Sequence, residues 1–512
     1  MLQHVLTTFQ HVLTSPAALG MGLAGVVIGI VFGALPGISS TMAIAVLLPL
    51  TFAMDEVNAM MFLMGVFNGS VYGGSVSAIL VNIPGTPGAI VTQLDGHPMA
   101  KKGRAGEALG YATLASGFGG LLGFVVLMTV APLLAGVALK FQSPEFTGLA
   151  LLGLASLSAA MTGSTAKGIL VGAFGLLIAT IGFDPITNVL RLDFDHPSLA
   201  AGITLIPVAI GIFGMTEVLN NLEAGATKWE VIGTIRRVIP PWSEMKRTVP
   251  GAIRGAVVGI CVGIIPAAGS AIGVVFTYLQ EKRLSRHPEL FGTGIPEGIV
   301  APESSNNAGV GGSLVPMMSL GIPGDTMTAV LMGALLIQGL RPGPLLFRDH
   351  PGFVAAVYVA LVIAIVLTTA LGLLGARTFA RVVSVPKPVL LVTIAVLCVV
   401  GSYAVNNSLF EVGVMLVFGV LGYLGQKAGF PMVPIVFGLI LGPMFEENLR
   451  RTLVLSGGNW LVFVQRPISV ALLVLAILTA AYPIYLERRQ EVRRRTASAV
   501  PGPAPAEPDE MR

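Results

Sequence analysis

Charged residues are scarce in this sequence. Only 11% of its 512 residues are Asp, Glu, Lys or Arg, whereas 54% are apolar, and the mean hydropathy is +0.84. A soluble protein carries about 25% charged residues because water wets its surface. The shortage excludes a large water-soluble domain and predicts that most of the surface faces lipid. The net charge of +4 comes from basic clusters between apolar runs, which favours cytoplasmic loops over a nucleic-acid-binding surface.

Cysteines and enzyme motifs are scarce as well. Cys261 and Cys398 both lie inside apolar runs, which favours packing over a disulfide framework. The histidines have no metal-ligand spacing, and the HExxH, GxSxG and Walker A patterns are absent. We therefore expect no enzymatic activity, no ATP-driven pumping by this chain and no cofactor.

Apolar runs, by contrast, fill the chain almost from end to end. A membrane-spanning helix needs about 20 mostly apolar residues, so we expect an all-α polytopic membrane protein with roughly 11–14 membrane segments. Proline and glycine interrupt four segments, at 17–54, 57–100, 251–279 and 305–340. Such interruptions predict broken helices and re-entrant hairpins, which are tolerated in a membrane where protein or a watery cavity surrounds them.

The interrupted segments form matched pairs. GVVIGIVFGALPGISSTMAIAV, which begins at Gly25, aligns with GAVVGICVGIIPAAGSAIGVVF, which begins at Gly255. The stretches that begin at Asn68 and Asn306 align through YGGS and VGGS and then through IPG in each. The chain thus consists of two similar halves with broken helices at corresponding positions. This pattern is typical of secondary transporters, whose binding sites lie at the broken helices.

The charges that flank the interruptions favour an inverted relation between the two halves. The first interrupted segment is followed by Asp55 and Glu56, whereas the second lies between basic clusters, so the two would enter the membrane from opposite sides. We expect an N-terminal segment (1–20), a first membrane repeat (21–225), a cytoplasmic linker (226–250), a second membrane repeat (251–486) and a disordered cytoplasmic tail that is basic and then Pro/Ala-rich (487–512).

Four loops at the interruptions carry the candidate site: LPGISST (35–41), NIPGTPG (82–88), IPAAGSA (265–271) and GIPGDTMT (321–328). The start of each following half-helix has unpaired N–H groups with a partial positive charge, which suit an anion. Freed carbonyls and hydroxyls also suit a hard cation such as sodium. The predicted substrate- and ion-binding residues are Pro36, Gly37, Ser39, Ser40, Asn82, Pro84, Gly85, Thr86, Gly269, Ser270, Asn306, Asn307, Pro323, Gly324, Asp325 and Thr326.

Some of these features also have structural explanations. Close helix packing explains four small residues at helical spacing as well as function does: Gly29, Gly33, Gly259 and Gly263. Two carboxyl groups, Glu303 and Asp325, lie in or beside interrupted segments of the second half. Carboxylates inside a membrane are costly and usually face the protein interior. Glu303 and Asp325 therefore either bind an ion or a proton, or lie in loops at the water interface.

Long stretches of the chain resemble a known family. GALPGISSTMAIAVLLPLTF, YGGSVSAILVNIPGTPGAIVTQLDGHPMAKKGRAGEAL and APESSNNAGVGGSLVPMMSLGIPGDTMTAVLMGALLIQGLRPGPLLF are similar to signature stretches of the TctA family. That family is the large membrane subunit of tripartite tricarboxylate transporters, and the resemblance covers about residues 20–460.

The resemblance implies a multi-pass protein of the bacterial inner membrane with two partners, a small TctB-like membrane subunit and a periplasmic TctC-like solute-binding protein. It also implies uptake of citrate or a related carboxylate, driven by a gradient of Na+ or H+. Two alternatives stay open: a stand-alone carboxylate–cation symporter, and an ion channel that uses the half-helix ends as a selectivity filter.

Overall fold

The computed structural model describes residues 2–160, 164–225, 235, 237–266, 269–383 and 385–498. Within these residues the fold is helical, and the strands are β1 (Gly182–Phe183) and β2 (Leu190–Arg191), an antiparallel pair with Gly182 opposite Arg191. Nine helical stretches among the described residues are long and apolar enough to cross a membrane, and two of them join consecutive elements, at Thr92–Ala138 and Leu205–Glu223. The prediction of an all-α polytopic membrane protein is therefore confirmed.

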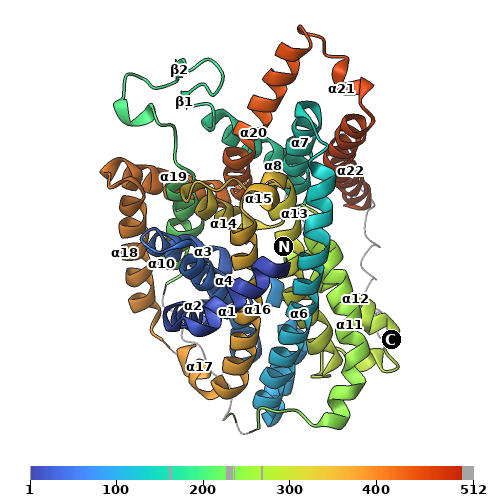
Figure 1. The fold of residues 1–512 in the computed structure, drawn as a ribbon. Coiled ribbons are helices and arrows are strands. Elements are labelled where there is room, and N and C mark those ends of the chain that lie inside the picture. The colour runs from blue at the N-terminus through green and yellow to red at the C-terminus, as the bar shows by residue number, and fades with distance from the viewer. Residues whose placement is uncertain are drawn as a thin grey trace, which may run out of the picture.

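The elements follow one another as labelled in Figure 1. Before residue 226 the helices are α1 (Leu2–Thr14), α2 (Pro16–Ala34), α3 (Ser40–Leu47), α4 (Glu56–Val81), α5 (Thr92–Met99), α6 (Ala105–Ala138), α7 (Ser143–Ala160), α8 (Thr165–Ile178), α9 (Leu205–Ala209) and α10 (Thr216–Glu223). After it they are α11 (Trp242–Ile264), α12 (Gly269–Leu284), α13 (Glu297–Leu320), α14 (Thr326–Ile337), α15 (Pro344–Asp349), α16 (Pro351–Leu374), α17 (Ala376–Val382), α18 (Lys387–Asn406), α19 (Leu409–Lys427), α20 (Val433–Leu455), α21 (Val462–Gln465) and α22 (Pro467–Ser498). Short 3-10 or π turns are η1 (Leu48–Thr51), η2 (Pro87–Ala89), η3 (Ala100–Arg104), η4 (Pro197–Leu199), η5 (Ile210–Met215) and η6 (Pro288–Leu290).

All four predicted interruptions are present. Helices α2, α4, α11 and α13 each end in the predicted loop, and α3, η2, α12 and α14 follow. Local chemistry explains the breaks. Pro36 has no N–H with which to continue α2, and Asn82 and Gly321 end α4 and α13 in the left-handed region, with φ of 59° and 72°.

Glycines let the paired helices touch along their backbones. A Cβ atom on Gly29 of α2 would lie 2.6 Å from the carbonyl oxygen of Val66 in α4, and one on Gly259 of α11 would lie 2.0 Å from that of Ser305 in α13. Similar contacts exist at Gly25, Gly33, Gly255 and Gly263. Close packing therefore explains the glycines at helical spacing, and the α2–α4 and α11–α13 pairs are built alike.

The halves also exchange contacts. Helix α3 of the first half packs against α14 of the second, and α12 of the second packs against η2 of the first. The long helices α6 and α13 lie side by side and join the halves over much of their length. These contacts place the four loops at the junction between the halves, while the inverted relation of the halves stays a prediction.

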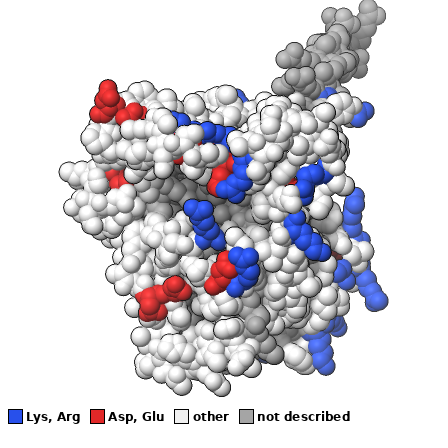
Figure 2. Space-filling view, turned by 45° about the horizontal axis from the view of Figure 1, so that its top comes forward, with Lys and Arg blue, Asp and Glu red and all other residues white. Residues whose placement is uncertain are grey.

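The surface carries few charges, and its outer helices are apolar. Figure 2 shows Lys, Arg, Asp and Glu in isolated groups on a mostly uncharged face. Helices α18 and α22, at opposite edges of Figure 1, expose large apolar side chains such as Val392 and Ile477, which are 64% and 65% exposed. These side chains are suited to contact with lipid.

One ionic network ties the β1–β2 hairpin to α20. Arg450 and Arg191 both pair with Asp184 and with Glu446, and the Arg191–Glu446 distance is 2.5 Å. The hydrogen bond from Arg450, together with backbone N–H groups of the hairpin, holds the pKa of Asp184 well below its usual value. The network fixes the hairpin to the end of a long helix.

The predicted domain boundaries stay predictions, although two helices run across them. Helix α11 begins at Trp242, inside the predicted linker, and α22 continues to Ser498, inside the predicted tail. Residues 226–234, 236 and 499–512 lie outside the described residues.

Candidate functional site

The loops at 35–41 and 321–328 meet. The hydroxyl oxygens of Thr41 and Thr326 are 2.7 Å apart and hydrogen-bonded. Each loop caps the helix that follows it: the Ser39 hydroxyl accepts a backbone N–H of α3, and the Asp325 carboxylate accepts the N–H of Thr328 at 2.8 Å. Two short helices, α3 and α14, thus bring their N-terminal ends, which carry partial positive charge, to one place inside the protein.

The loop at 82–88 lies against the other half. A Cβ atom on Gly88 would be 1.9 Å from the side-chain oxygen of Asn306, so this loop and α13 are in contact. The N–H of Gly85 donates to the carbonyl of Gly74 at 3.3 Å, which holds the loop on α4. Asn82 is exposed and ends α4, so the structure does not bring it into the buried part of the site.

Several buried polar atoms without partners lie beside these loops. Six of them, in the described part of the chain, are Ser40 Oγ, Ser75 Oγ, Thr86 Oγ1, Ser305 Oγ, Asn306 Nδ2 and Asn307 Oδ1. A buried polar group without a hydrogen bond costs about 1–3 kcal/mol, so such a cluster points to a bound ligand or water. Four of these residues are among those predicted. Ser75 and Ser305 are not, although the repeated YGGS and VGGS stretches could have drawn attention to Ser75.

The second half contains a small cavity of about 10 Å³, roughly the space of one water molecule, where α11, α12, α13 and the start of α14 meet. Its polar lining consists of Ser270, Ser305, Ser313 and Asp325. Predicted Gly269 and Gly324 also line it, so the structure brings the start of α12 to the loop at 321–328, whereas residues 267–268 of the predicted loop at 265–271 lie outside the described residues. Ser305 and Ser313 are additions that only the fold reveals.

The remaining predicted residues surround this buried region. Pro36, Gly85 and Pro323 are buried, and Pro84 is half-buried. Gly37 is exposed, has a φ of 83°, and its carbonyl accepts a hydrogen bond from the Asn221 amide at 3.4 Å.

Glu303 joins the halves from the interior of α13. Its side chain is 0% exposed, and its carboxyl group is hydrogen-bonded to the hydroxyls of Thr92 on α5 and Ser116 on α6, the latter at 3.1 Å. Asn307, one turn further along α13, donates to Ser116 at 2.8 Å. The carboxyl group of Glu303 therefore lies in the protein interior, not in a loop at the water interface.

Asp95 on α5 is a second buried link between the halves. Its Oδ1 accepts the backbone N–H groups of Gly292, Gly294 and Ile295 at 2.8–3.0 Å, and its Oδ2 accepts the Tyr278 hydroxyl at 2.9 Å. All four donors belong to the second half. Sequence reasoning missed this residue, although one acidic residue in the LDGHPM stretch is a signal that could have found it.

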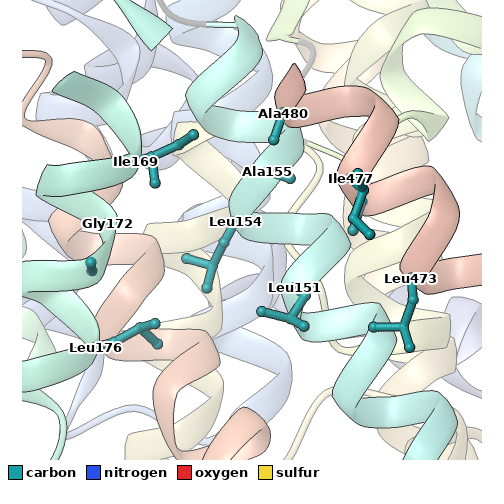
Figure 3. A pocket seen from close by; sticks show the side chains of 11 residues that line it. Leu151, Leu154, Ala155, Ile169, Gly172, Leu176, Leu473, Ile477 and Ala480 are labelled. Atoms are coloured by element: carbon teal, nitrogen blue, oxygen red, sulfur yellow. The ribbon is translucent and has the colours of Figure 1, made fainter. Parts of the chain in front are cut away.

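Another hollow has a different kind of lining. The groove in Figure 3, between α7, α8 and α22, is lined by apolar side chains such as Leu151, Ile169 and Leu473. It offers no donor or acceptor side chain for a polar solute, so it is not part of the candidate site.

Broken helices, facing half-helix ends and buried unpartnered polar atoms, set in a polytopic helical protein, define a membrane transport protein. The chain belongs to the tripartite tricarboxylate transporter TctA family, whose sequence pattern matches residues 19–437. It is therefore a transporter subunit and not an enzyme.

Two proteins from Agrobacterium vitis are similar to this chain. One, described as an uncharacterized 52.8 kDa protein in the TAR-I ttuC' 3' region, is 36% identical over 494 residues, which cover 94% of this chain and 97% of that protein. The other, described as an uncharacterized protein in the TAR-II ttuC' 3' region, is 33% identical over 241 residues, 46% of this chain and 98% of that protein. No solved structure matches.

Proposed function

We propose that this chain is the large permease subunit that takes up a small carboxylate, citrate or a related di- or tricarboxylate, across the bacterial inner membrane. A TctC-like periplasmic protein would deliver the substrate, a TctB-like membrane subunit would complete the permease, and a gradient of Na+ or H+ would drive uptake. The meeting of the α3 and α14 N-terminal ends, joined through Thr41 and Thr326, carries this proposal.

The arrangement suits an anion that must be released again. Backbone N–H groups at the two helix starts that the Ser39 and Asp325 caps do not occupy attract a carboxylate without a fixed arginine, which would hold it tightly. The unpartnered side chains of Ser40 and Asn306 supply a hydroxyl donor and an amide donor. Because the site lies where the halves exchange contacts, relative movement of the halves would open it to either side. Moving one charge through 100 mV is worth about 2.3 kcal/mol, which is enough to drive uptake.

We expect Ser40→Ala and Asn306→Ala each to raise the substrate concentration for half-maximal uptake. A hydrogen bond to a charged group contributes about 1.5–3 kcal/mol, which corresponds to a change of about 10- to 100-fold. Thr129→Ala, at an exposed position of α6, is the matched control. Normal uptake by both Ser40→Ala and Asn306→Ala would show that the substrate does not bind at this site.

The deciding assay is uptake of labelled citrate and of dicarboxylates into proteoliposomes that hold this chain and its small partner, under inward gradients of Na+ or of H+. Saturable uptake that requires both the binding protein and a gradient supports the tripartite transporter. Uptake without the binding protein favours the stand-alone symporter, and flux that does not saturate favours the channel.

Orientation in the membrane gives a separate test. Counting the apolar segments as crossings puts the basic cluster at Lys101, Lys102 and Arg104 in the cytoplasm. A reporter enzyme that is active only in the cytoplasm is expected to be active when it is fused after Lys102. A reporter that is active only in the periplasm is expected to be inactive at the same position. Activity of a periplasmic reporter at this position would contradict the proposed topology.

A further inference from the structure

Among the described buried acids, Glu303 has neither an ion pair nor a helix start or backbone N–H groups to stabilise its charge. The described buried acids that form ion pairs are Glu145 with Arg466, Asp184 with Arg450 and Arg191, and Glu281 with Arg254. Asp95 accepts three backbone N–H groups, and Asp325 caps α14. Glu411 lies in the first turn of α19, where the helix dipole favours an anion. None of the ion pairs among the described residues includes Glu303.

Position makes an ionised Glu303 costly. The residue lies in the seventh position of the 24-residue helix α13, away from its ends, and its side chain is 0% exposed. The groups that interact with its carboxyl group are neutral hydroxyls, those of Thr92 and Ser116 and, beside them, that of Ser75. A carboxylate that is buried without a cation is strongly destabilised and is neutralised instead.

The hydrogen-bond pattern has room for one proton. Asn307 donates to the Ser116 oxygen, which leaves the Ser116 hydrogen free to donate to Oε2 of Glu303. The Thr92 hydroxyl contacts Oε1, and a hydroxyl can accept as well as donate. A hydrogen on Oε1 can therefore be donated to the Thr92 oxygen.

A proton fits here better than a metal cation does. A Cβ atom on Gly119 of α6 would lie 2.1 Å from the carbonyl oxygen of Ser304, and one on Gly123 would lie 2.5 Å from that of Ala308. The backbones of α6 and α13 are thus in contact beside Glu303. A proton needs no additional volume, whereas a cation with a shell of oxygen ligands needs these helices to separate.

We propose that Glu303 is a proton-binding site at the junction of the halves and that its proton is the coupling ion of transport. The coupling role rests on the proposed function. The proton enters from the outer aqueous phase, binds Oε1 and leaves to the cytoplasm. Thr92 and Ser116 belong to the first half and Glu303 to the second, so movement of the halves would break these hydrogen bonds and expose the carboxyl group to water.

Many of the titratable groups on the elements packed against α13 have partners of their own. They are Tyr72 on α4 with Thr113, His97 on α5 with the carbonyl of Ile79, Asp95 on α5 with Tyr278 on α12, Glu107 on α6 with Arg104, Tyr111 on α6 with Glu244 on α11, Arg254 on α11 with Glu281 on α12, Asp325 before α14 with Thr328, and Arg348 with Asp349 on α15. None of the cations on these elements, which include Lys246 and Arg247 on α11 and Lys282 and Arg283 on α12, forms an ion pair with Glu303 among the described residues. A proton can therefore remove the charge of Glu303, which no cation among the described residues neutralises.

The first test needs no transport. Infrared spectra of the purified chain at neutral pH should contain the carbonyl stretch of a neutral carboxylic acid. Glu303→Gln, which keeps the shape of the side chain, should remove that band, whereas Asp325→Asn and the exposed control Glu289→Gln should leave it.

Thr92→Val should shift the band because it removes one hydrogen bond, and it provides a second variant in case Glu303→Gln does not fold. A band that is absent from the unmodified chain, or that survives Glu303→Gln unchanged, overturns the proposal.

The second test measures coupling in proteoliposomes with the small partner, the binding protein and a trapped pH-sensitive dye. The unmodified complex should accumulate carboxylate under an inward proton gradient and acidify the lumen. Glu303→Gln should lose accumulation and acidification but should still exchange labelled for unlabelled carboxylate. Glu289→Gln should keep accumulation and acidification. Proton-driven accumulation by Glu303→Gln overturns the proposal. The absence of all carboxylate flux from the unmodified complex contradicts the proposed function instead, and the infrared result still decides whether Glu303 binds a proton.

Discussion

Replacing Asp95 with alanine is expected to destabilise the protein by several kcal/mol. The change leaves the N–H groups of Gly292, Gly294 and Ile295 and the Tyr278 hydroxyl without their acceptor. Each donor left unpaired in the interior costs about 1–3 kcal/mol. The segment that joins α12 to α13 would then lose its attachment to α5, and with it a direct link between the halves.

Two milder variants separate the contributions of the Asp95 carboxylate. Asp95→Asn keeps one oxygen that can accept the three backbone N–H groups, and Tyr278→Phe removes only one hydroxyl. Thermal unfolding of the detergent-solubilised chain should therefore show a much larger drop in the unfolding temperature for Asp95→Ala than for either. Equal unfolding temperatures for Asp95→Ala and Tyr278→Phe would show that the backbone hydrogen bonds contribute little.

Replacing Gly259 with alanine is expected to abolish uptake. The added methyl group would lie 2.0 Å from the carbonyl oxygen of Ser305, and a backbone atom cannot move away as a flexible side chain can. Helix α11 would have to move away from α13, at a cost of about 1–3 kcal/mol or more. Because Gly259 and Ser305 both line the cavity beside Asp325, the movement would deform the site itself.

The structure offers matched controls for this substitution. Gly136 in α6 and Gly413 in α19 have no atom within 4 Å of an added Cβ. Alanine at either position should preserve uptake and stabilise the helix by about 1 kcal/mol, because alanine has the higher helix propensity. Uptake and unfolding temperature measured for the three variants check the prediction. Normal uptake by Gly259→Ala would mean that the α11–α13 contact is looser than the structure shows.

Asn82 and Ser305 show where sequence reasoning reached its limit. Asn82 stands in one of the four loops and was predicted to bind substrate, but the structure gives it an exposed, left-handed position at the end of α4. Ser305 directly precedes two predicted asparagines, yet its role at the cavity depends on the crossing of α11 and α13. A motif identifies a loop, whereas the direction of each side chain depends on the backbone around it.

The sequence by itself determined the features that depend on local chemistry. Scarce charge and long apolar runs determined a helical membrane protein, and Pro36, Asn82 and Gly321 determined where helices end, because a missing N–H or a left-handed residue acts at its own position. Long shared motifs determined the family.

Only the tertiary structure decided which of these pieces meet. Thr41 bonds Thr326, Glu303 bonds Thr92, and Asp95 bonds a loop almost 200 residues away. Helices α4 and α13 are buried along most of their length on all sides, so no alternation of apolar and polar residues marks the face that contacts a given neighbour. The close approach of glycine backbones and the satisfaction of buried polar groups select those neighbours, and both depend on the packing of the whole chain.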